Sequence, residues 1–107
     1  MTMENQRRKE RERLWGEMLQ RSGDDPRQML AVALEALTEF PGDGQFLYRA
    51  AVCGMRIADD LEDAAAREEA LRRAQVHAQQ AVEADPRDPS ARWIRSEIRK
   101  RLAGEQE

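Results

Sequence analysis

A stretch of small residues on one helical face, closed by a proline, constrains this chain more than any other feature. Ala74, Ala78 and Ala81 are spaced four and three residues apart, so they share one side of a helix. Pro86 ends that helix, because proline lacks a backbone N–H and disfavours helical φ and ψ in the residue before it. Small side chains allow two helix axes to come close, so this face predicts a tightly packed helix pair.

A weaker copy of the same spacing lies upstream. Met29, Ala33, Ala36 and Pro41 repeat it, and both copies then run into a short polar turn and a new apolar segment. The two prolines, Pro41 and Pro86, are 45 positions apart. The chain is therefore predicted to repeat one helical unit with an irregular period.

The run A-x3-A-x2-A-x4-P resembles the second helix of a tetratricopeptide (TPR) repeat, and residues 46–51 (FLYRAA) resemble its first helix. Ala51 stands where that family usually has glycine. A TPR repeat spans about 34 residues, so the excess of roughly eleven must lengthen the helices or the loop between them. The resemblance covers residues 26–96 and implies a short solenoid of about two repeats plus a capping helix.

Composition and turn signals predict an all-α fold of about five antiparallel helices. Only four prolines and six glycines interrupt the 107 residues, and β-branched residues are scarce. Turns are expected at 22–25, 41–44, 59–63 and 85–89. We interpret residues 1–107 as one helical domain, with 1–13 frayed or exposed, 14–103 as the TPR-like core and 104–107 as a disordered tail.

Several apolar positions can be assigned to the core from helical spacing. In the helix expected over 26–39 the buried residues are Leu30, Ala33, Leu34 and Leu37. The last helix, from Pro89, is expected to turn Trp93, Ile94, Ile98 and Leu102 inward. The helices between them are predicted at 44–58, with Gly54 at a close helix crossing, and at 61–84.

The chain carries little that suggests catalysis, and we expect no enzyme activity, metal or cofactor. It has a single histidine, His77, and a single cysteine, Cys53, which is expected to be a buried small hydrophobe. The acidic run 59–63 lacks the glycine and ligand spacing of a calcium loop, so Asp60 or Asp63 is interpreted as a helix cap.

The expected location is the bacterial cytoplasm. One cysteine forms no intramolecular disulfide, which indicates a reducing compartment. The N-terminus has charges where a signal peptide needs an apolar core, and no apolar run is long enough to span a membrane. Alanine- and arginine-rich usage indicates a bacterial source, and no membrane partner is expected.

The TPR resemblance implies that first helices line a surface that holds a peptide or a partner helix. Mapped residue by residue, the partner-binding positions are Tyr48, Arg49, Val52, Met55 and Arg56, with Trp93 and Lys100 on the last helix. Such residues suit an acidic, partly apolar peptide. The competing interpretation is that Tyr48 and Trp93 only complete a thin core.

Three functions remain open from the sequence. The first is a non-catalytic protein–protein interaction module. The second is association with nucleic acid through the basic last helix, although the formal net charge of −3 makes that partner unlikely on charge alone. The third is a structural homo-oligomer held by an apolar face that a short solenoid leaves uncovered. The basic residues of the second hypothesis, grouped around Trp93, are Arg92, Arg95, Arg99, Lys100 and Arg101.

Overall fold

A computed structural model describes residues 3–22 and 25–104, and the side chains of residues 18, 19, 21 and 22 lie outside this description. Over these residues the chain has five helices and no strand, which confirms the all-α class predicted from the sequence. The helices are α1 (Met3–Ser22), α2 (Pro26–Glu39), α3 (Gly44–Asp60), α4 (Ala64–Ala84) and α5 (Pro89–Leu102). None of the described helices combines the length and apolar character needed to cross a membrane.

An aspartate immediately before the first residue caps each helix from α2 onward. The side chains of Asp25, Asp43, Asp63 and Asp88 accept backbone N–H groups of the first turn, which have no partner within the helix. Asp63 is thus the member of the acidic run that caps a helix. Helix α4 therefore starts three residues later than the predicted position 61.

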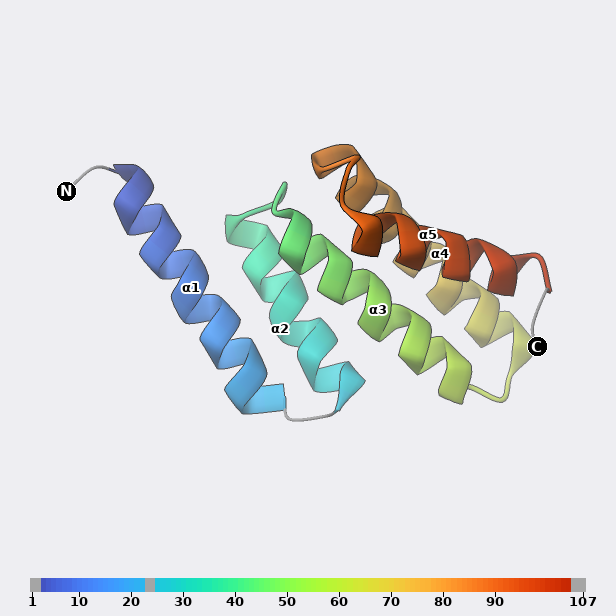
Figure 1. The fold of residues 1–107 in the computed structure, drawn as a ribbon. Helices are drawn as coiled ribbons and strands as arrows, with labels where there is room; N and C mark the ends of the chain where they lie inside the picture. The colour runs from blue at the N-terminus through green and yellow to red at the C-terminus, as the bar shows by residue number, and fades with distance from the viewer. Residues whose placement is uncertain (1–2, 23–24, 105–107) are drawn as a thin grey trace.

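The helices are arranged around α3. Each helix packs against the next one in the chain, and α3 also contacts α5. Figure 1 shows α3 between α1 and α2 on one side and α4 and α5 on the other. The molecule is elongated, with principal extents of 50 × 29 × 19 Å and a Cα radius of gyration of 14.4 Å, against about 13 Å for a compact domain of this length.

Two main hydrophobic clusters follow from this arrangement, and α3 contributes to both. One joins α3, α4 and α5 around the fully buried Ile94 and Ile98. The other joins α1, α2 and α3 around Phe46, which is completely buried. A smaller cluster around Leu47 links α3 to α4 and α5. Burial of α3 on several sides agrees with its apolar residues lying nearly all round the helix.

The predicted alanine face lies at the contact between α3 and α4. Ala74, Ala78 and Ala81 are each at most 1% exposed. A Cβ placed on Gly54 of α3 would stand 3.0 Å from the Cβ of Ala74, so the two helices touch where both side chains are smallest. The predicted close crossing at Gly54 and the burial of the three alanines are confirmed.

Two predicted core residues are exposed. Leu34 is 41% exposed because the buried side of α2 is centred on Val32, Ala33 and Ala36. Trp93 is 49% exposed because it precedes Ile94 by one residue, which turns it about 100° around α5 from that buried position. The inward orientation predicted for these two residues is wrong.

Gly104, at a φ of 78°, follows the end of α5 in the left-handed conformation that favours glycine. The rest of the predicted tail, 105–107, and the turn residues Gly23 and Asp24 lie outside the described residues.

Candidate partner-binding face of helix α3

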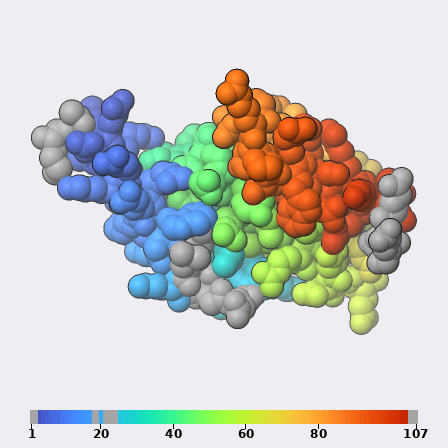
Figure 2. Space-filling model, in the orientation of Figure 1, coloured from blue at the N-terminus to red at the C-terminus, as the bar shows by residue number. Residues whose placement is uncertain are grey.

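One side of α3 is left uncovered by the other helices. We call it the α3 face and define it by Gln45, Tyr48, Arg49, Val52 and Arg56, which are half-buried or exposed. Their spacings of three, four and seven residues place them along one side of the helix. Figure 2 shows atoms of α3 at the surface between those of α1 and those of α5.

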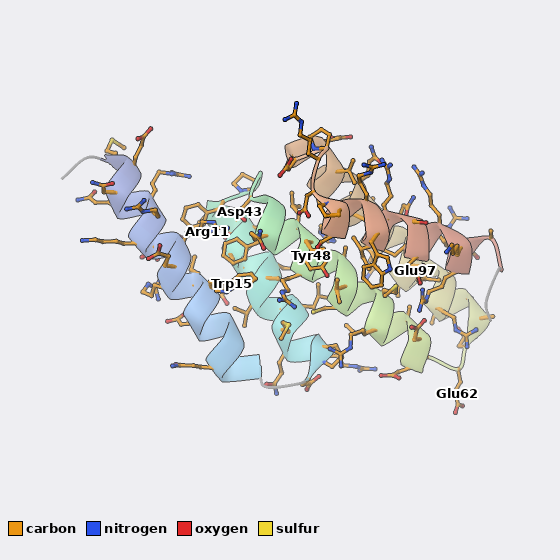
Figure 3. All side chains as sticks on the ribbon, viewed as in Figure 1. Arg11, Trp15, Asp43, Tyr48, Glu62 and Glu97 are labelled. Carbon is orange, nitrogen blue, oxygen red and sulfur yellow. The ribbon has the colours of Figure 1, made fainter. Side chains whose placement is uncertain are left out.

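Arg49 is held on this face by two aromatic rings. Its guanidinium carbon lies 5.4 Å from the ring centroid of Trp15 in α1 and 5.8 Å from that of Tyr48. In Figure 3 these two rings approach from α1 and α3 on the same side of the molecule. Attraction between a cation and an aromatic face is worth about 0.5–1 kcal/mol at exposed sites and more when water is excluded.

The guanidinium of Arg49 has no acceptor within the described residues. Its Nε is buried and makes no hydrogen bond, and no described carboxylate forms an ion pair with it. The two terminal amino groups also lack a described partner, yet only Nε is enclosed, so they remain in contact with solvent. Arg49 therefore presents two oriented, unpaired N–H donor groups at the surface.

Arg56 continues the same row two turns further along α3. Its side chain is exposed and forms no ion pair with a described residue. Val52, half-buried, lies between the two arginines. Arg49 and Arg56 thus present two unneutralised positive charges on either side of an aliphatic side chain.

Met55 does not belong to this face. It is 6% exposed and packs in the cluster shared by α3, α4 and α5, so its predicted position at a partner-binding surface is wrong. Met55 lies seven residues after Tyr48 and therefore on the same side of α3, at the edge of the face, where this helix packs against α4 and α5. Tyr48 itself is half-buried against that cluster and also contacts Arg49.

A polar row on α5 borders the α3 face. Trp93, Glu97 and Arg101 are four residues apart, and Arg101 makes two bonds to Asp59 of α3, of 2.9 and 3.1 Å. These bonds raise the pKa of Arg101. The carboxylate of Asp59, a possible partner for Arg56, is therefore engaged by α5.

Lys100 is also tied within α5. Its Nζ lies 3.4 Å from Glu97 Oε2, and the side chain is exposed. Glu97 accepts from Arg101 as well, at 3.5 Å. Of the two α5 residues predicted to bind a partner, Trp93 offers an exposed apolar surface and Lys100 offers a charge that Glu97 partly neutralises.

The other basic residues of α5 form a separate row. Arg92, Arg95 and Arg99 are spaced three and four residues apart, and Arg95 donates to Gln79 of α4 at 3.3 Å. This row therefore faces the α4 side of the helix. The structure divides the five basic residues of the nucleic-acid hypothesis between two sides of α5.

Sequence reasoning missed the part that α1 plays next to the face. Arg11 forms an ion pair with Asp43, the cap of α3, with a distance of 3.2 Å from Nη2 to Oδ1, and its guanidinium lies over the ring of Phe46. Figure 3 shows Arg11 and Asp43 side by side. Hydrogen bonding to Asp43 raises the pKa of Arg11. Because 32 residues separate the pair, helical spacing gave no signal for it.

Burial shifts the pKa of the single cysteine and of the single histidine. Burial raises the pKa of the Cys53 thiol, although the charges of Arg56 and Arg49 oppose this, so the thiolate is disfavoured. Burial lowers the pKa of His77, which favours its neutral form. Among the described residues, no group of three histidine, cysteine or acidic side chains lies close enough together to hold a metal ion.

Comparisons with protein-family models, with curated proteins and with solved structures gave no match to this chain.

Proposed function

We propose that the protein is a non-catalytic protein–protein interaction module, a TPR-like helical scaffold that binds a peptide or partner helix over the α3 face. The observation that carries this proposal is the state of Arg49. Its guanidinium is oriented by Trp15 and Tyr48, reaches solvent and has no described carboxylate. A fixed, unneutralised charge beside apolar side chains is suited to a partner that supplies the missing acceptor.

The composition of the face supports the same proposal. Tyrosine, tryptophan and arginine are the residue types that most often carry binding energy at protein interfaces. Tyr48, Arg49 and Arg56 lie on α3, and the exposed Trp93 lies on the neighbouring α5. In the TPR-like interpretation α1, α3 and α5 are the first helices of successive units, which are the helices that meet a partner.

A second candidate function is association with nucleic acid through α5. Arg92 and Arg99 are exposed and form no ion pair with a described residue, and Trp93 offers a ring for stacking. Binding of this kind would weaken steeply with salt, because phosphate contacts release counterions. Partner capture through the α3 face depends on salt less steeply, since few charges take part.

The test is a charge reversal on the face compared with an equal reversal elsewhere. The variant Arg49→Glu/Arg56→Glu is compared with Arg27→Glu/Arg87→Glu, whose arginines are exposed and form no side-chain ion pair with a described residue. Each variant changes the net charge by the same amount. Both are used, after light scattering has established the oligomeric state, to capture partners from lysate of the source cells.

We expect the wild type and the Arg27/Arg87 variant to retain the same partner, and the Arg49/Arg56 variant to lose it while keeping its helical content. Its melting temperature should fall by only a few degrees, through loss of the contacts of Arg49 with Trp15 and Tyr48. Retention of the partner by the Arg49/Arg56 variant would place the interface elsewhere. Loss of the partner on reversal of Arg92 and Arg99, with a steep salt dependence, would favour the nucleic-acid function. A concentration-dependent dimer lost in the Arg49/Arg56 variant would identify the partner as a second copy.

A further inference from the structure

We infer that the partner of the α3 face is an acidic amphipathic helix, with two carboxylates about two turns apart that pair with Arg49 and Arg56. An apolar side chain between those carboxylates would lie over Val52. This inference rests on the proposed function and adds the chemistry and spacing of the partner.

The partner is expected to carry carboxylates because the arginines of the face have N–H donors without an acceptor among the described residues. Arg49 has its Nε enclosed and its terminal amino groups at the surface, so an acceptor approaches it end-on, where two parallel N–H groups fit the two oxygens of a carboxylate. The neighbouring acid Asp59 is already bonded to Arg101, and Arg56 has no described partner. The partner must therefore bring its own acids.

The partner is expected to be a helix because of the distance between Arg49 and Arg56 along α3. Seven residues of α3 advance about 10 Å along its axis. A partner helix lying nearly parallel or antiparallel to α3 presents residues i and i+7 on one side with the same spacing, and residues i+3 or i+4 between them. An extended chain advances about 10 Å from residue i to residue i+3, and the side chains of these two residues point to opposite sides. A helix therefore satisfies both arginines at once.

The acidic residues near the face favour a partner with two spaced carboxylates and disfavour a long polyanion such as a nucleic acid. Asp60 is exposed at the end of α3, and Glu97 lies on the bordering row of α5. A continuous phosphate backbone crossing the face would meet these acids as well as the arginines, at a cost from like-charge repulsion. A helix that carries carboxylates only at i and i+7 avoids that repulsion.

The probe is a synthetic alanine-rich helix of about 20 residues, long enough to be helical in water. It carries glutamate at i and i+7, leucine at i+3 and i+4, and glutamine on its other sides. The matched control replaces both glutamates with glutamine, and a third peptide carries lysine at both positions. Binding to the full chain is followed by isothermal calorimetry at physiological salt.

We expect the glutamate peptide to bind the wild type at least about tenfold more tightly than the glutamine peptide, as charge-assisted bonds predict. We expect Arg49→Glu/Arg56→Glu to reverse the order, so that the lysine peptide binds more tightly than the glutamate peptide. The Arg27→Glu/Arg87→Glu variant should keep the wild-type order. A reversal of preference excludes a merely structural role, because unfolding weakens all three peptides alike.

The outcomes separate this inference from the proposed function. Equal binding of the glutamate and glutamine peptides, or no binding of either, overturns the acidic helix. If a partner is still captured from lysate through Arg49 and Arg56, the interaction module stands with a different occupant. A single-stranded RNA oligonucleotide is added as a competitor of the glutamate peptide. If the RNA binds more tightly than the peptide and displaces it, the inference is overturned in favour of a nucleic acid.

Discussion

Ala74 of α4 occupies the space where a side chain on Gly54 of α3 would stand: a Cβ on residue 54 would lie 3.0 Å from the Cβ of Ala74 and 3.6 Å from its Cα. Alanine at position 54 would gain up to about 1 kcal/mol of helix propensity. Overpacking against a rigid neighbour costs about 1–3 kcal/mol, so the overpacking term is the larger one.

We therefore expect Gly54→Ala to lower the free energy of unfolding by up to about 2 kcal/mol, measured by urea denaturation. Adding Ala74→Gly should recover part of that loss, because it removes the opposing methyl group. Gly16→Ala is the control, since nothing lies within 4 Å of its added Cβ. That variant should be as stable as the wild type or slightly more stable, and a stabilised Gly54→Ala variant would show that the helices separate easily.

The second prediction concerns the alanine face itself. Ala78→Leu and Ala81→Leu should each lower the free energy of unfolding by about 1–3 kcal/mol, because both alanines are buried between helices. The same substitution at Ala65, which is exposed on α4, should change stability by less than about 0.5 kcal/mol. Thermal melting of the three variants is the measurement. Equal melting temperatures would mean that the face opens to accept the larger side chains.

Much of this fold was predictable because its signals are local. Proline and the capping aspartates fix where helices start, and the bounds of α2, Pro26–Glu39, agree with the prediction from the sequence. The alanine spacing predicted the contact between α3 and α4. Leu34 and Trp93 were misplaced because apolar character alone does not say which side of a helix is covered.

The candidate site was predictable only along one helix. Tyr48, Arg49, Val52 and Arg56 were assigned through the TPR resemblance and share one side of α3, whereas the ring of Trp15 and the ion pair of Arg11 come from α1. Contacts between residues more than 30 positions apart depend on how the helices pack, and helical periodicity carries no signal for that. Met55 was assigned to the face although it is buried, because the sequence does not show where the exposed side of α3 ends and the core begins.

His77 gives a prediction for pH. Burial lowers its pKa in the folded state below the ordinary value of about 6.5, so the unfolded chain takes up a proton at higher pH than the folded one. The stability contributed by the neutral imidazole is complete above that value and is lost as the pH falls through the lowered pKa. Between about pH 7.5 and pH 5 the wild type should lose more stability than His77→Gln, measured by urea unfolding. Equal losses would show that the pKa of His77 is unchanged by folding.

Cys53 should be slow to react with thiol reagents. It is 1% exposed, and burial raises the pKa of its thiol, so both access and thiolate formation oppose reaction. We expect labelling by Ellman's reagent to be much slower in buffer than in concentrated urea. Gly54→Ala should accelerate it, because a less stable fold opens more often. Labelling in buffer at the unfolded rate would contradict the buried position.

The last prediction tests the link between α1 and the start of α3. The side chain of Asp43 is 11% exposed, and it both accepts the N–H groups of Gln45 and Phe46 and pairs with Arg11, whose side chain is 35% exposed. Asparagine at position 43 retains an oxygen for capping but loses the charge that Arg11 pairs with. A double-mutant cycle of Asp43→Asn and Arg11→Met should give a coupling energy of about 0.5–1 kcal/mol, near the upper end for partly exposed pairs.

The same asparagine substitution at Asp25 supplies the control, because Asp25 caps α2 through Arg27 N–H and forms no ion pair with a described residue. Its combination with Arg11→Met should be additive. The coupling at Asp43 should shrink in about 1 M salt, where the screening length falls to about 3 Å. A coupling energy of zero at low salt would mean that α1 is held to α3 only by apolar contacts such as those of Trp15 with Phe46, whose ring centroids lie 5.7 Å apart.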